Sequence, residues 1–123
     1  MSRRRIYLSG PMTGIEPREY RRRFHEAEAI LRRHGYGCIN PCRVWACRFH
    51  WIYRAMEWAL GKRLAYAAVL CYDLLLLITR ADGIAMLPGW RASRGAQIEN
   101  YVARHFPMMG ISKAAAEEIE RIK

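Results

Sequence analysis

The chain lacks the usual marks of a membrane or secreted protein. Its most apolar run, Leu64–Ile78, is interrupted by Asp73 and falls short of the roughly 20 apolar residues that span a bilayer. The arginines at positions 3–5 precede only a brief apolar stretch and then Ser-Gly-Pro, which is not a secretory signal. We therefore expect a cytoplasmic protein with no membrane contact, whose four cysteines stay reduced.

Acidic residues are scarce. The chain has 11 Asp and Glu against 21 Lys and Arg. The resulting net charge of +10 attracts anions in general. A phosphorylated small molecule fits this charge, and non-specific nucleic-acid contact does too, although no nucleic-acid-binding motif is present. Three arginine clusters stand out, and we interpret them as two solvated helix faces and a frayed terminus: 3–5, 21–23 and 32–33.

No repeat or low-complexity linker divides the chain, so residues 1–123 are expected to form a single domain. Apolar periodicity and turn residues predict strands at 6–9, 36–39, 83–87 and, more weakly, 107–111. Helices are predicted at 17–34, 44–60, 62–79, 93–104 and 112–122, with a break at Gly61. This alternation predicts a three-layer α/β domain with a small, mostly parallel sheet of four to five strands, flavodoxin- or Rossmann-like.

Ligands of such sheets bind beyond the carboxyl ends of the strands. Two segments should therefore frame the site, and their candidate binding residues are Ser9, Gly10, Thr13 and Gly14 after the first strand, and Gly89, Trp90, Ser93, Arg94 and Gly95 after the third. A helix start flanked by arginines could hold a phosphate. Ser93 is either a simple cap or an anion ligand. Trp90 either stacks on a base or covers the edge of the core.

Two carboxylates are the candidate catalytic groups. Asp73 lies in a strongly apolar segment, where a carboxylate is costly unless it faces a cleft or the one wet side of its helix. Glu99 follows a helix start whose dipole favours an ionised nucleophile, but an ordinary solvent-facing Glu is the alternative. Tyr7 in the first strand could be a core aromatic, and Asp82 is interpreted as a turn residue.

The cysteines do not indicate a metal site. The spacing of Cys38, Cys42, Cys47 and His50 matches no standard paired-ligand pattern, so we interpret the cysteines as small buried apolar residues. We expect neither a metal nor a cofactor.

Several short motifs together resemble the DUF4406 family, which is common in phages and prophages. They are Tyr7-Leu-Ser-Gly-Pro-Met-Thr-Gly14, Asn40-Pro41, Asp73-Leu74, Ala81-Asp82, Leu87-Pro-Gly-Trp90, Ser93-Arg-Gly-Ala96 and Glu99. That family is similar to nucleoside 2-deoxyribosyltransferases and to deoxynucleoside 5′-monophosphate N-glycosidases. The resemblance implies the fold of that superfamily. It also implies that Glu99 is the nucleophile, that Asp73 contacts the base and assists its departure, and that Tyr7 orients the nucleophile.

Ser93 matches the monophosphate N-glycosidases, where the resemblance implies a role on the phosphate. The expected function is therefore hydrolysis or transfer at the N-glycosidic bond of a nucleoside or deoxynucleoside 5′-monophosphate, with Ser9, Ser93 and Arg94 as the phosphate clamp. The alternatives are a non-catalytic nucleotide-binding or sensing protein of phage or prophage origin and, ranked last, a nucleic-acid-binding protein. The resemblance also implies a homo-oligomer, for which the apolar helix Trp51–Trp58 could supply the interface.

Overall fold

The structure is a computed structural model that describes residues 4–11, 15–41, 50–106, 108 and 110–122. Three parallel strands form one sheet: β1 (Arg5–Ser9), β2 (Gly37–Ile39) and β3 (Gly83–Met86), in the order β2-β1-β3. β1 lies in the centre, with Ile6 opposite Cys38 on one side and Gly83 on the other. The α/β class and the parallel sheet are confirmed, with three strands among the described residues rather than four or five.

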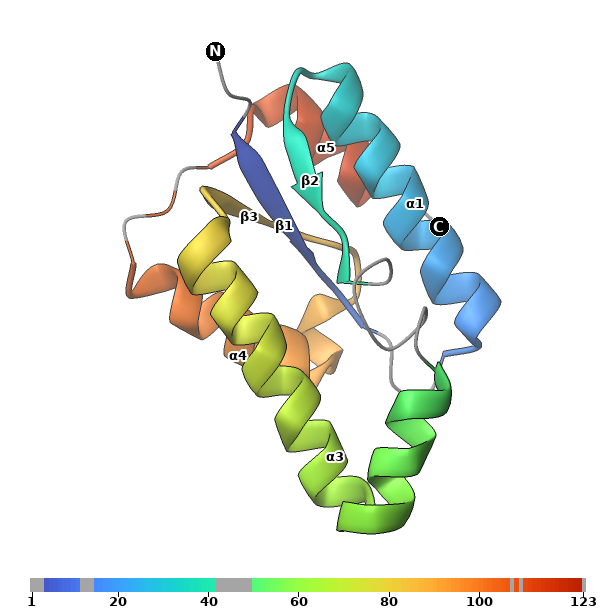
Figure 1. Ribbon diagram of the computed structural model, residues 1–123. Coiled ribbons are helices and arrows are strands. Elements are labelled where there is room, and N and C mark those ends of the chain that lie inside the picture. The colour runs from blue at the N-terminus through green and yellow to red at the C-terminus, as the bar shows by residue number, and fades with distance from the viewer. Residues whose placement is uncertain (1–3, 12–14, 42–49, 107, 109, 123) are drawn as a thin grey trace.

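Helices cover both faces of the sheet (Figure 1). α1 (Pro17–Arg33) and α5 (Lys113–Glu120) lie on one face, while α3 (His50–Arg80) and α4 (Arg94–Arg104) lie on the other. No helix in the described part of the chain has the length and apolar character needed to cross a membrane.

The alternation of side chains along β1 divides the core in two. The first cluster lies under α1 and α5, and its central members are Ile6, Leu8, Phe24, Leu31 and Ile119. The second lies under α3 and α4 and contains Tyr7, Leu76, Leu77 and Ala103. Because successive strand residues point to opposite faces, one strand supplies both clusters. The predicted three layers are thus present.

Local chemistry explains where the helices begin and end. The hydroxyl of Ser93 accepts the Ala96 amide at the start of α4, and the hydroxyl of Ser112 does the same for Ala115 at the start of α5. Gly61 has a φ of 85°, which L side chains rarely adopt, and it divides α3 into the two predicted halves.

The weak strand predicted at 107–111 is absent from the residues described there. The Met108 amide donates to the Phe106 carbonyl over 2.7 Å in a tight turn, so that donor is used locally. Proline at position 107 has no amide hydrogen to offer a neighbouring strand. Ile111 instead packs against the first core cluster as part of the approach to α5.

Candidate active site

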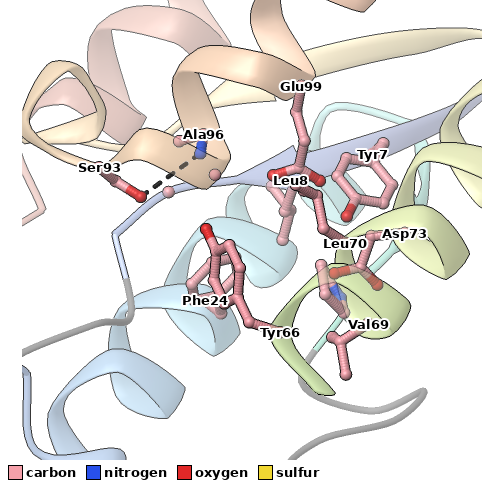
Figure 2. A pocket seen from close by; sticks show the side chains of 13 residues that line it. Tyr7, Leu8, Phe24, Tyr66, Val69, Leu70, Asp73, Ser93, Ala96 and Glu99 are labelled. Carbon is pink, nitrogen blue, oxygen red and sulfur yellow. Dashed lines mark hydrogen bonds between the residues drawn. The ribbon is translucent and has the colours of Figure 1, made fainter. Parts of the chain in front are cut away.

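Two acids, the buried Glu99 and the half-buried Asp73, line one cavity of about 90 Å³ at the carboxyl end of β1, which we call the acid cavity. Asp73 comes from α3 and Glu99 from α4, 26 positions later in the chain. Figure 2 shows Tyr7, Asp73 and Glu99 pointing toward one another from a strand and two helices. The complete lining is Tyr7, Leu8, Gly10, Phe24, Pro41, Tyr66, Val69, Leu70, Asp73, Ser93, Gly95, Ala96 and Glu99.

Glu99 is held by β1. The Ser9 hydroxyl donates to Oε1 of Glu99 over 2.9 Å, and only 7% of the Glu99 residue surface is exposed. Burial raises the pKa of Glu99 to about 7, although the hydroxyls of Tyr7 and Ser9 act in the opposite direction. The solvent-facing alternative is therefore wrong. Burial thus opposes the ionisation of Glu99 that the helix dipole was expected to favour.

Asp73 faces the same cavity and is half-buried. Burial raises its pKa to about 8, and the neighbouring Glu99 carboxylate adds to the increase because two like charges disfavour each other. Oδ1 of Asp73 and Oε2 of Glu99 are both buried, and neither accepts a hydrogen bond from any residue that the structure describes. Such oxygens are costly unless a proton, water or ligand satisfies them. With pKa values of about 8 and about 7, one of the two acids can be protonated while the other is ionised near neutral pH.

A larger hollow of about 700 Å³ lies beside the acid cavity, and Tyr66 and Ser93 line both spaces. We call it the arginine hollow, because Arg23 from α1 and Arg94 from α4 line it. Its other lining residues are Pro11, Ile15, Pro88, Gly89 and Ala92. A cationic wall next to two acids allows one ligand to place an anionic group in the hollow and a neutral, reactive part at the acids.

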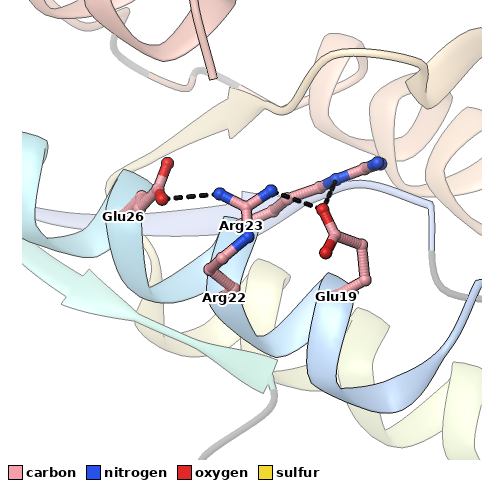
Figure 3. Close-up of polar contacts among 4 residues, drawn as sticks. All are labelled: Glu19, Arg22, Arg23 and Glu26. Carbon is pink, nitrogen blue, oxygen red and sulfur yellow. Dashed lines mark hydrogen bonds and ion pairs between the residues drawn. The ribbon is translucent and has the colours of Figure 1, made fainter. Parts of the chain in front are cut away.

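Arg23 is positioned by an ion-pair network on α1 (Figure 3). Its Nε lies 3.3 Å from Oε1 of Glu19, and the same oxygen contacts Arg22. Arg22 also pairs with Glu26 over 2.6 Å. Arg22 is exposed and paired, as a solvated helix face requires, whereas Arg23 borders the arginine hollow.

Gly10 and Gly95 allow close approach at the acid cavity. A Cβ at position 10 would lie 2.7 Å from Cβ of Leu87, so the end of β1 meets the end of β3 only with glycine there. A Cβ at position 95 would lie 2.8 Å from the hydroxyl of Tyr66. Gly95 therefore provides the space in which the Tyr66 ring crosses from α3 to the start of α4.

Several predicted binding residues lie elsewhere. Trp90 and Arg91 line a separate hollow of about 290 Å³. Cζ of Arg91 lies 5.3 Å from the centre of the Trp90 ring. Gly89 lines that hollow and the arginine hollow but not the acid cavity. Thr13 and Gly14 lie outside the described residues, as do Cys42 and Cys47. Cys38 is a half-buried residue of β2.

Sequence reasoning missed Tyr66 and Arg23 as site residues. Tyr66 precedes Asp73 by seven positions, which places the two on the same face of α3. This spacing was a usable signal. Arg23 offered none, because nothing in the sequence separates it from the neighbouring arginines.

The structural role of Asp82 differs in detail from the predicted turn contact. Its Oδ2 accepts the backbone amide of Arg5 over 2.9 Å, and its own amide donates to the Arg5 carbonyl. Asp82 thus fixes the amino end of β1 beside that of β3, which helps to place Tyr7 and Ser9 under the helices.

Comparison with known proteins places the chain in a family without assigning an activity. Residues 4–111 match the family model DUF4406, which is described as a domain of unknown function. Searches of curated proteins and of solved structures found no match. Because the match covers most of the sequence, the chain belongs to the DUF4406 family.

Proposed function

We propose that this protein cleaves or transfers the N-glycosidic bond of a nucleoside or deoxynucleoside 5′-monophosphate. The observation that carries the proposal is the convergence of Asp73 and Glu99 on one cavity from two helices, with pKa values raised to about 8 and about 7. In carboxyl pairs of this kind, the protonated member donates a proton to the leaving group and the ionised member acts as the nucleophile.

The chemistry requires one proton on the pair. Ionised Glu99 attacks C1′ of the sugar through the unpartnered Oε2, forming a C1′–O bond while the C1′–N bond breaks. The electron pair of the broken bond moves to the base, and protonated Asp73 supplies the proton that the leaving base needs. Water, or a second base, then attacks C1′ and gives a proton to Asp73, while the C1′–O bond breaks and Glu99 is released as a carboxylate. Near neutral pH, Glu99 has the lower pKa of the two and is the one to ionise first.

The remaining site residues support a phosphorylated substrate. Arg23 and Arg94 line the arginine hollow, and Ser93 lies on both it and the acid cavity. A 5′-phosphate in the hollow would be paired with guanidinium groups and would hold the sugar toward the acids. The acid cavity of about 90 Å³ has room for the reacting atoms, and the base and phosphate extend into the adjoining space.

A panel of common ribonucleoside and deoxyribonucleoside monophosphates, monitored for free base by chromatography, tests the proposal. Base release should occur with at least one substrate and should fall by at least about 1,000-fold in Glu99→Gln, because removal of a nucleophile eliminates the covalent step. Glu117→Gln is the matched control, since Glu117 is exposed on α5 and away from both spaces. The control should keep full activity.

Calorimetry with the same panel separates catalysis from binding alone. Nucleotide binding without base release would support the non-catalytic alternative. No base release from any member of the panel, in the absence or presence of an acceptor base, would reject the enzymatic proposal.

A further inference from the structure

A third acid of this protein is buried, on α1, and the proposed reaction does not use it. Only 4% of the Glu28 residue surface is exposed, whereas Glu26 of the same helix is exposed. A buried carboxylate is costly unless it is paired and hydrogen-bonded, and an apolar side chain of similar volume is often at least as stable in its place. The polar arrangement around Glu28 therefore indicates a role other than stability.

Glu28 contacts two residues through its two carboxylate oxygens. Oε1 accepts a hydrogen bond from Nδ2 of Asn40 over 3.1 Å, in the interior of the protein. Oε2 accepts one from Nε of Arg32 over 2.9 Å, one helical turn further along α1. The Arg32 side chain is 51% exposed and balances the charge of Glu28 from the solvent side. Asn40 is 2% exposed, so Glu28 connects α1 to the interior through this residue.

Asn40 in turn determines where the next residue lies. It follows the last residue of β2 and precedes Pro41, which is buried and lines the acid cavity. The proline ring fixes its own φ and restricts the backbone of the residue before it. The position of Asn40 therefore largely decides the position of the Pro41 ring. A hydrogen bond from Glu28 to the Asn40 side chain thus also holds Pro41 in the wall of the cavity.

The same helix supplies another part of this wall. Phe24 precedes Glu28 by four positions, so the two side chains lie on one face of α1. Phe24 is 1% exposed and, like Pro41, lines the acid cavity (Figure 2). Apolar walls exclude water, and burial is the largest cause of the raised pKa values of Asp73 and Glu99. A displaced wall would therefore change the environment of both acids.

We infer that Glu28 is a positioning residue for the acid cavity: through Asn40 it holds Pro41 in place and so keeps water away from the two acids. The consequence for catalysis rests on the proposed function, whereas the exclusion of water does not. Among the described lining residues of the cavity, the titratable side chains are Tyr7 from β1, Tyr66 and Asp73 from α3, and Glu99 from α4. Arg23 and Arg94 line the adjoining arginine hollow.

Loss of the contact between Glu28 and Asn40 should move the pH optimum of base release to lower pH. The reaction requires ionised Glu99 and protonated Asp73, and their pKa values of about 7 and about 8 limit the active range. Water in the cavity lowers both pKa values toward 4.5 and 3.8, so both limbs of the profile should move down by roughly one unit. A smaller folded fraction alone would lower the activity without moving the two limbs together.

Four variants separate the position of Asn40 from the charge of Glu28. Glu28→Met removes the contact and keeps the length of the side chain, so it should shift the optimum. Glu28→Gln removes the same charge but keeps an oxygen that accepts Nδ2 of Asn40, so its optimum should match the parent. Asn40→Ala keeps the charge and should behave like Glu28→Met. Glu26→Met is the matched control, because the Glu26 side chain is 46% exposed on the same helix, and it should shift nothing. Equal shifts in Glu28→Gln and Glu28→Met would overturn the inference.

Urea denaturation tests the inference without catalysis. Asp73→Asn should raise the urea midpoint of the parent near pH 8, because it removes a desolvated ionisable group. In the Glu28→Met background this gain should fall by roughly half, and in the Glu26→Met background it should be unchanged. If Glu28→Met does not fold, Asn40→Ala takes its place in both measurements. An undiminished gain would overturn the inference even if base is released. A diminished gain without base release would support it and reject the proposed function instead.

Discussion

Replacing Asp73 by asparagine should stabilise the protein at alkaline pH, because the folded chain pays for a buried charge there. The pKa of Asp73 is raised from 3.8 to about 8 in the folded state. Between these values the folded protein keeps a proton that the unfolded chain has released, so unfolding releases a proton. Stability from this group is complete below pH 3.8 and is lost as pH rises toward about 8.

The size of this effect follows from the linkage relation. At about 1.4 kcal/mol per pKa unit, ionisation of Asp73 removes roughly 4 kcal/mol of stability between about pH 5 and about pH 8. Asparagine has nearly the shape of protonated aspartic acid and cannot ionise. Asp73→Asn should therefore match the parent below about pH 3.8, exceed it by roughly 1.5 kcal/mol near pH 5, and exceed it by about 5 kcal/mol near pH 8.

Urea denaturation of the parent and the variant across this pH range measures the difference. Glu99→Gln should give a smaller gain in the same direction, because the pKa of Glu99 rises only from 4.5 to about 7. Asp82→Asn is the control, since Asp82 is exposed, lies outside the acid cavity and accepts the Arg5 amide. That variant should gain nothing at high pH. If Asp73→Asn is no more stable than the parent near pH 8, Asp73 is not buried as described, and the mechanism that needs protonated Asp73 fails with it.

Three further substitutions test the construction of the site. Gly10→Ala should cost about 1–3 kcal/mol of stability in urea denaturation, because the new Cβ meets the Leu87 side chain 2.7 Å away; an unchanged midpoint would contradict this close approach. Ser9→Ala removes the hydrogen bond to Glu99, so the acidic limb of the pH–activity profile should move up by about one unit, and a fixed limb would show that Glu99 does not control it. Tyr66→Ala should leave stability within about 1 kcal/mol, because the ring is 39% exposed, but it should raise KM for a nucleotide several-fold. An unchanged KM would exclude Tyr66 from the bound state.

Most helix boundaries were predictable because they depend on local chemistry. Ser93 and Ser112 cap helices through their own hydroxyls, and Gly61 interrupts α3 through a backbone conformation that favours glycine. The weak strand predicted at 107–111 does not form among the residues described there, because a strand needs a partner and the Met108 amide already donates to the Phe106 carbonyl. The periodicity of apolar residues does not indicate whether such a segment forms a strand or a local turn.

The sequence predicted the two acids of the candidate site but not the aromatic residue that lines the cavity beside them. Asp73 stood out because its neighbours are apolar, and Glu99 stood out through the motif around Ser93. Trp90 was predicted either to stack on a base or to cover the edge of the core, and the turn at Gly89 places it in a different hollow from the acids. Tyr66 reaches the acid cavity from α3, the helix of Asp73, although no motif included it. Which aromatic side chain reaches a cavity depends on helix packing, which a single sequence does not specify.

Because β1 is the central strand, the same five residues supply side chains to the core and to the candidate site. Ile6 and Leu8 point into one cluster while Tyr7 and Ser9 point toward Glu99, so each residue of this strand has a single permitted side. Slipping the strand by one residue would put apolar groups at the acids and hydroxyls into the hydrocarbon interior. Deleting or inserting one residue within Arg5–Ser9 should thus prevent correct folding, whereas a change of length outside the strand leaves its register unchanged.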